Sequence, residues 1–209
     1  WSPTLKYADS CGMKLKFISR EQYRDKESEA FLNQLQSQFP DAMIIPEGGT
    51  SELAIKGCEE ILSEADREYD YICTSVGTGG TMTGLINASS SHQNILGFSA
   101  LKSKHLSEEI KRMTTNTNWS INTDYHFGGY AKTSAELIHF MNDFFRKSRI
   151  KLDPVYTGKL LFGIFELAQK NYFPKGSKIL AIHTGGLQGI EGMNERLRKK
   201  AQPQIITEL

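Results

Sequence analysis

The chain has 209 residues and nearly balanced charge, with 25 lysines and arginines against 24 aspartates and glutamates and a net charge of +1. Such a balance gives no electrostatic reason to expect binding to nucleic acid or to a membrane. Hydrophobic residues make up 39% of the chain, without any apolar run of bilayer-spanning length, so the composition indicates an ordinary globular protein.

The N-terminal part of the chain predicts a helix, a strand and a second helix, in that order. Ser2 and Pro3 are typical of a helix start, and the residues after them predict a helix over 4–11. Apolar and basic residues alternate over 13–19, which predicts a strand. Residues 20–39 are charged, with apolar positions at helical spacing, and predict one long helix with a solvated face.

Strands and helices alternate along the rest of the chain. The predicted strands or extended segments are 42–46, 70–74, 94–101, 119–125 and 178–183, and the predicted helices are 50–66, 79–88, 106–113, 133–148, 160–172 and 188–200. This alternation is typical of an α/β fold with a mainly parallel sheet and helices on both faces. The only candidate domain boundary is the change in composition near Ala42.

Four predicted loops combine glycines with polar side chains, as binding sites often do: Glu47–Ser51, Ser75–Gly84, Asp153–Lys159 and His183–Gly186. Ligands of open parallel sheets bind at the carboxyl ends of the strands. We therefore expect these loops to lie at the same edge of the sheet.

The stretch Ser75–Gly84 lies between an apolar run and a helix start, and it predicts a cradle for a phosphate. The cradle residues are Gly77, Thr78, Gly79, Gly80 and Thr81. The stretch has neither the Gly-Lys-Ser/Thr of a Walker loop nor the third small residue of a dinucleotide fingerprint. A tight turn with a purely structural role is the alternative.

Several single residues suggest the chemistry of a flat cofactor. The loop tyrosines Tyr130 and Tyr156 form a candidate acid–base pair, useful only if a phenol pKa falls below about 10; each alone is typical of a packing residue. The hydroxyl of Thr184 follows a predicted strand and could meet a ring nitrogen. We expect Lys159 to be solvated or paired with a carboxylate rather than to form a Schiff base.

The cysteines and histidines suggest neither a metal site nor a disulfide framework. The three cysteines and five histidines lack the required spacing. We therefore expect no metal, buried free thiols at Cys11, Cys58 and Cys73, and a reducing compartment, the cytoplasm.

Two late motifs, Asp153–Lys159 and Ile182–Gly186, resemble those of the D-cysteine desulfhydrase and 1-aminocyclopropane-1-carboxylate deaminase group. These are pyridoxal 5′-phosphate enzymes of the tryptophan synthase β-like fold, and the similarity covers essentially the whole chain. The resemblance implies that residues 1–42 are the C-terminal remnant of a small domain. Residues 43–209 would then be the large cofactor-binding domain.

The resemblance also implies that part of the enzyme lies upstream. The Schiff-base lysine of the family belongs to a Gly-Asn-Lys motif and its substrate-carboxylate loop to a Ser-Asn-His motif, neither of which occurs here. The chain begins at Trp1 rather than Met, so we expect an N-terminal part to be absent. On this basis we expect residues 1–209 alone to be inactive.

Carried over residue by residue, the resemblance assigns roles to the candidate positions. Gly77, Thr78, Gly79, Gly80 and Thr81 would hold the cofactor phosphate, Thr157 and Thr184 would contact the cofactor ring, and Tyr130 and Tyr156 would flank the substrate. The substrate would be a small amino acid, and the family suggests a homodimer.

Two threonines separate the branches of this resemblance. The cyclopropane deaminases have Glu in place of Thr157 and Leu in place of Thr184. A carboxylate beside the ring nitrogen keeps that nitrogen protonated and strengthens the ring as an electron sink, whereas threonine leaves a weaker sink. The chain therefore leans toward α,β-elimination from a D-amino acid, for example D-cysteine giving pyruvate, ammonia and sulfide.

Three other interpretations stay open. The first is deamination of 1-aminocyclopropane-1-carboxylate by the same site. The second is a non-catalytic truncated fragment that keeps the fold without the Schiff-base lysine. The third is an unrelated α/β domain that binds a phosphate ligand, which leaves the motifs around Tyr156 and Thr184 unexplained.

Overall fold

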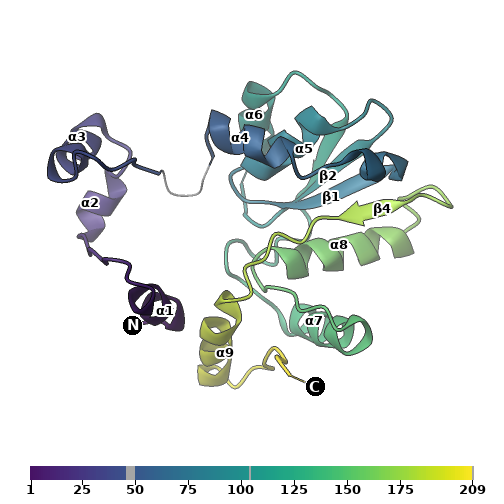
Figure 1. The fold of residues 1–209 in the computed structure, drawn as a ribbon. Coiled ribbons are helices and arrows are strands. Elements are labelled where there is room, and N and C mark those ends of the chain that lie inside the picture. Colours follow the sequence, from purple (N-terminus) through teal and green to yellow (C-terminus); the bar gives the residue numbers. More distant parts are fainter. Residues whose placement is uncertain (46–49, 104, 209) are drawn as a thin grey trace. The chain divides into compact units, whose positions relative to one another are not determined.

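The computed structural model describes residues 1–45, 50–103 and 105–208. The chain divides into two compact units, an N-terminal unit of residues 1–49 and a main unit of residues 50–209 (Figure 1). Within the described residues, no helix combines the length and the hydropathy needed to cross a bilayer.

The described part of the N-terminal unit contains three short helices: α1 (Pro3–Ser10), α2 (Arg20–Arg24) and α3 (Glu29–Gln38). A serine begins each of them, because its hydroxyl accepts a hydrogen bond from a backbone N–H of the first turn. None of the three helices has a buried residue.

Three predictions for this unit are wrong. Residues 13–19 and 42–45 form no strand, because no partner strand pairs with them among the described residues. The single helix expected over 20–39 is broken, because Ser28 caps a new helix. The thiol of Cys11, expected to be buried, is exposed just after α1. Pro46 and the turn at residues 47–49 lie outside the described residues.

The main unit is built on a four-stranded sheet. The strands are β1 (Tyr71–Val76), β2 (Asn94–Ser99), β3 (Trp119–Asn122) and β4 (Ile179–Ala181), in the order β3-β2-β1-β4. Every pairing between them is parallel. The predicted α/β fold with a parallel sheet is therefore confirmed. Strand β1 extends two residues beyond its expected end, whereas β2, β3 and β4 are two or three residues shorter than expected.

Helices cover both faces of this sheet (Figure 1). The helices are α4 (Glu52–Glu59), α5 (Gly80–Ala88), α6 (Leu106–Met113), α7 (Ala135–Ser148), α8 (Thr157–Gln169) and α9 (Gly189–Lys199), with a 3-10 turn at Glu64–Glu68. Alternate residues of β1 point to opposite faces, so Ile72 packs with α5 and α6, whereas Cys73 packs with α8.

Helices α4 and α8 depart furthest from their predicted boundaries. The helix expected over 50–66 ends at Glu59, and a 3-10 turn follows in which the Asp66 carboxylate accepts from the backbone N–H and the hydroxyl of Ser63. Helix α8 begins at Thr157 rather than Leu160, because a carboxylate caps its first turn. That capping carboxylate belongs to the site described next.

Candidate functional site

The glycine-rich loop (Gly77–Thr81) joins the carboxyl end of β1 to the start of α5. Gly79 has a φ of +95°, and a Cβ on it would lie 2.9 Å from Cγ1 of Ile110, so a side chain is excluded at this position. No side chain caps the start of α5 within the described residues. The first amides of the helix therefore have no described side-chain acceptor, an arrangement compatible with the predicted phosphate cradle.

The hydroxyls of the glycine-rich loop already have neighbours. Thr78 forms a side-chain hydrogen bond with Thr50, and the Thr81 hydroxyl contacts the Cys58 thiol at 3.9 Å. Thr50 also approaches Gly80, where a Cβ would lie 3.0 Å from its hydroxyl. The described end of the Glu47–Ser51 loop thus lies beside the glycine-rich loop, as expected from the parallel sheet.

Tyr156 stands directly against the glycine-rich loop. A Cβ on Gly77 would lie 3.3 Å from Cε1 and 3.4 Å from the hydroxyl oxygen of Tyr156. The ring of Tyr130 meets the Tyr156 ring edge to face, with 6.3 Å between their centroids. The two predicted tyrosines are therefore brought together, Tyr156 half-buried and Tyr130 largely exposed at the surface.

The electrostatics of the tyrosine pair differ from the prediction. Burial, and secondly the neighbouring Tyr130 and Asp153, raise the pKa of Tyr156 above its usual value. A phenol with a raised pKa keeps its proton near neutral pH. Tyr156 is therefore suited to donating a hydrogen bond or proton, and the lowered pKa required of a phenolate base is not found at this residue.

Asp153 organises the start of α8, a role that the sequence analysis missed. One carboxylate oxygen accepts from the backbone N–H of Val155 and Tyr156, at 2.8 and 2.9 Å. The other oxygen accepts from the N–H and the hydroxyl of Thr157, each at 2.7 Å. An acidic residue just before a predicted helix is an N-cap signal, and the Asp-Pro pair at 153–154 carries it.

The hydroxyl of Thr157 points into this network rather than to open space. Besides donating to Asp153, it accepts from the Asp153 backbone N–H at 2.8 Å, and the residue has no exposed surface. The expectation that Thr157 contacts a cofactor ring directly is thus not met in this structure. Its hydroxyl instead fixes the carboxylate that shapes the loop before Tyr156.

The loop at His183–Gly186 reaches the same edge of the sheet. It follows β4, whose neighbour is β1, and a Cβ on Gly186 would lie 3.1 Å from the carboxyl carbon of Asp153. The His183 ring is held by hydrogen bonds with the Lys151 carbonyl and the Gly185 N–H. Thr184 is exposed, and its hydroxyl makes no hydrogen bond with the described residues, so it is available to a ligand.

The environment of Lys159 contradicts its prediction. The side chain is neither solvated nor paired with a described carboxylate, because it is 1% exposed and its ammonium donates to three backbone carbonyls. Burial lowers the pKa of Lys159 to about 8, and the more distant Asp153 carboxylate opposes this shift. The acceptors lie far from Lys159 in sequence, so no local signal identified them.

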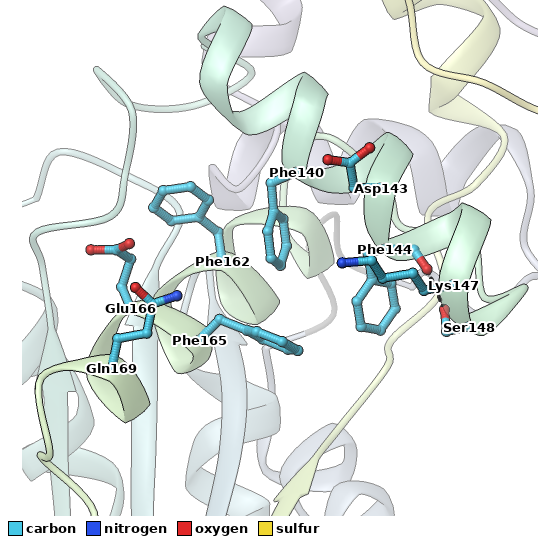
Figure 2. A pocket seen from close by; sticks show the side chains of 9 residues that line it. All are labelled: Phe140, Asp143, Phe144, Lys147, Ser148, Phe162, Phe165, Glu166 and Gln169. Atoms are coloured by element: carbon cyan, nitrogen blue, oxygen red, sulfur yellow. Dashed lines mark hydrogen bonds between the residues drawn. The ribbon is translucent and has the colours of Figure 1, made fainter.

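An apolar cavity of about 430 Å³ lies away from these loops, between α7 and α8. Figure 2 shows four phenylalanine rings forming its walls, with charged side chains at the margin. Its lining residues are Phe140, Asp143, Phe144, Lys147, Ser148, Phe162, Phe165, Glu166 and Gln169. None of the predicted site residues contributes to it. In the parts of the chain that the structure describes, no three His, Cys, Asp or Glu side chains cluster as metal ligands.

A family model described as "Pyridoxal-phosphate dependent enzyme" matches residues 6–185. A putative 1-aminocyclopropane-1-carboxylate deaminase of Pyrococcus horikoshii is 30% identical over 189 residues, which cover 82% of this chain and 58% of the relative. The mitochondrial bifunctional D-cysteine desulfhydrase/1-aminocyclopropane-1-carboxylate deaminase of Arabidopsis thaliana is 29% identical over 213 residues, covering 86% and 51%.

Two solved structures share the fold. The crystal structure of an ACC deaminase homologue superposes with a TM-score of 0.77 at 24% identity, covering 95% of this chain and 66% of that one. The processed form of threonine deaminase isoform 2 from Solanum lycopersicum gives a TM-score of 0.58 at 16% identity, covering 93% and 60%. The chain spans between about half and two thirds of the length of these proteins.

Proposed function

Because the chain belongs to the pyridoxal-phosphate dependent enzyme family, we propose that its main unit is the larger part of a cofactor-binding domain that acts on a small amino acid. Family membership agrees with the resemblance drawn from the Asp153–Lys159 and Ile182–Gly186 motifs, and with the cofactor expected from them. Residues 1–42 are assigned to a second, smaller domain. The division of the chain into units at residues 49 and 50 supports this assignment.

The observation that carries the proposal is the fit of the glycine-rich loop to a phosphate. Gly79 is left-handed, no described side chain caps the start of α5, and the parallel strand β1 leads into this turn, an arrangement that suits anion binding by backbone amides. A Cβ on Gly79 would clash with α6, so only glycine permits this conformation. Gly77, Thr78, Gly79, Gly80 and Thr81 would therefore hold the phosphate.

The other end of the cofactor is assigned to the loops that follow β4 and precede α8. Pyridoxal phosphate supplies an electron-accepting ring for reactions at the α-carbon of an amino acid. Thr184 carries an exposed hydroxyl without a described partner, which suits it to the ring nitrogen. Thr157 acts at this end through Asp153, because its hydroxyl is already bound twice by that residue.

The tyrosine pair is assigned to the substrate side. Tyr156 lies against Gly77 and keeps its proton, so it holds a proton at its hydroxyl oxygen for the departing group. Tyr130 is more exposed and its ring lies edge to face with that of Tyr156, which supports a role for Tyr130 at the side from which a small substrate arrives. These roles require no metal.

Elimination from D-cysteine is the preferred reaction within this proposal. A neutral threonine hydroxyl at the ring nitrogen, the role assigned to Thr184, favours loss of a good leaving group such as thiolate over opening of a cyclopropane ring. The named relatives include deaminases of 1-aminocyclopropane-1-carboxylate and a bifunctional enzyme, so deamination is the second candidate. The Schiff-base lysine is assigned to sequence upstream of Trp1, and without it the 209 residues alone bind the cofactor without turning over substrate.

Protein expressed from the complete reading frame tests this proposal. We expect a visible absorption band from bound pyridoxal phosphate and release of sulfide from D-cysteine. We expect the double variant Thr157→Glu/Thr184→Leu to shift the preference toward 1-aminocyclopropane-1-carboxylate. Absence of the band would contradict the enzyme assignment, and an unchanged preference would contradict the argument from the threonines.

Assembly and location complete the proposal. A homodimer is the assembly that the family resemblance suggests, and sedimentation of the complete protein measures it. A cytoplasmic location is consistent with three cysteines that form no disulfide, Cys11, Cys58 and Cys73. Fractionation of cells that express the tagged complete protein tests this location.

A further inference from the structure

Lys159 is a buried lysine at the start of α8 whose ammonium is bound entirely by backbone oxygens. Its side chain is 1% exposed. The ammonium nitrogen lies 3.2 Å from the carbonyl oxygen of Ala100, 2.9 Å from that of His126 and 2.8 Å from that of Gly129. An ammonium has three N–H donors, so each donor has one acceptor.

These acceptors come from two segments far from Lys159 in sequence. Ala100 directly follows β2, whereas His126 and Gly129 belong to the loop at residues 126–132, which carries Tyr130. This loop is unusual in its backbone, since Phe127, Gly128, Gly129 and Ala131 all have positive φ values of 53°, 92°, 115° and 51°. Such a conformation is costly unless surrounding contacts hold it, and Lys159 supplies two of those contacts.

The start of α8 also positions the second tyrosine. Tyr156 precedes the helix, and the Asp153 carboxylate accepts from its backbone N–H. Lys159 lies within the first turn of the same helix. The start of α8 therefore holds Tyr156 through the Asp153 carboxylate. It also holds the loop of Tyr130 through the Lys159 ammonium. The rings of Tyr130 and Tyr156 meet edge to face.

We propose that Lys159 is a positioning residue, whose ammonium holds the Tyr130 loop against α8 and thereby sets the geometry of the Tyr130–Tyr156 pair. A buried cation without a bonded carboxylate is unfavourable for folding. A methionine would fill the same space at a lower desolvation cost but would bind no carbonyl. The positioning of Tyr130 explains what the buried charge contributes.

The geometric part of this inference is independent of the reaction, while its catalytic consequence rests on the proposed function. The first test is the nuclear Overhauser effect between the rings of Tyr130 and Tyr156 in the 209-residue chain with labelled tyrosines. We expect Lys159→Met to abolish this signal while core methyl resonances of α7 persist. The matched control is Lys170→Met, since Lys170 is an exposed lysine directly after α8 that donates to the hydroxyl of Tyr125.

An unchanged signal between the two rings in Lys159→Met would overturn the proposal. If that variant does not fold, the unaltered chain still tests it. We expect one slowly exchanging lysine ammonium with cross-peaks to the α-protons of Gly129, and absence of such an ammonium would equally overturn the proposal.

The complete enzyme separates positioning from general structural damage. We expect Lys159→Met to lower kcat about 100-fold, the order of loss that follows a small misplacement of catalytic groups, with cofactor affinity unchanged. An equal loss of cofactor affinity would overturn the proposal, because the three carbonyls that the ammonium binds lie outside the glycine-rich loop. If the complete protein proves inactive, the ring-to-ring signal still decides the geometric claim.

Discussion

The buried ammonium of Lys159 predicts an unusual dependence of stability on pH. Burial lowers its pKa from the ordinary 10.5 to about 8 in the folded chain. Between these values the unfolded chain binds the proton more tightly, so the free energy of unfolding rises as the pH rises. With Lys159 charged in both states, the full shift lowers the free energy of unfolding by about 3 kcal/mol. Roughly 2 kcal/mol of this loss is regained as the pH rises from 7 to 10.

Other groups act in the opposite direction and must be removed from the comparison. Burial raises the pKa values of Tyr71, Tyr156 and the Cys73 thiol, so these groups weaken folding as the pH approaches and passes their ordinary values. They are present in both the unaltered chain and Lys159→Met. The difference between the two proteins therefore isolates the lysine.

Urea unfolding at pH 7, 8, 9 and 10 measures this difference. Fluorescence of Trp119 in a Trp1→Phe background reports on the main unit alone, since these are the only two tryptophans. We expect the unaltered chain to gain roughly 2 kcal/mol relative to Lys159→Met across this range. The difference between the unaltered chain and Lys170→Met should stay constant over this range, because both keep Lys159, and the Tyr125 hydroxyl and Glu166 raise the pKa of Lys170 above its ordinary value. Equal pH dependence for the unaltered chain and Lys159→Met would refute the reasoning.

Three further predictions concern other parts of the main unit and the thiols. Because the φ of Gly79 is positive, Gly79→Ala should lower the free energy of unfolding by about 1–3 kcal/mol in urea and weaken pyridoxal phosphate binding in a spectroscopic titration. The control Gly57→Ala, with open space around the Cβ position, should change neither quantity. Thr157→Val should cost about 2 kcal/mol in the same unfolding assay, because the buried carboxylate loses a donor; an unchanged midpoint would contradict the network. Burial raises the pKa of Cys73 to about 12, so mass spectrometry after thiol labelling at pH 8 should find Cys11 modified and Cys73 modified only in urea.

The parts of the fold that sequence patterns predicted are those set by local periodicity. The apolar run leading into the glycine-rich loop, the helical spacing over 106–113 and the glycines at 77, 79 and 80 each encode a preference within a few residues. The structure accordingly contains β1, α5 and α6 close to their expected positions. Where a pattern required a distant partner, as in the strand expected over 13–19, prediction failed, because an isolated strand has no ladder to join.

In the candidate site, too, local sequence signals predicted some features, whereas others depend on tertiary contacts. Its residue types and its family could be read from the sequence, because glycines at a strand end and the motifs around Tyr156 and Thr184 are contiguous signals. Their proximity followed from the parallel sheet. The role of Thr157 could not be read from the sequence, since one hydrogen bond decides whether a threonine points to a ligand or to its own helix start.

The sequence by itself thus determined the succession of strands and helices in the main unit, the glycine-rich turn and the family, all of which depend on short-range pattern. Only the tertiary structure decided the state of Lys159 and Tyr156. The burial of the ammonium depends on carbonyls from Ala100, His126 and Gly129, and the raised pKa of the phenol depends on burial and on Tyr130 and Asp153. Desolvation and Coulomb forces depend on distance in space, which the order of residues along the chain does not specify.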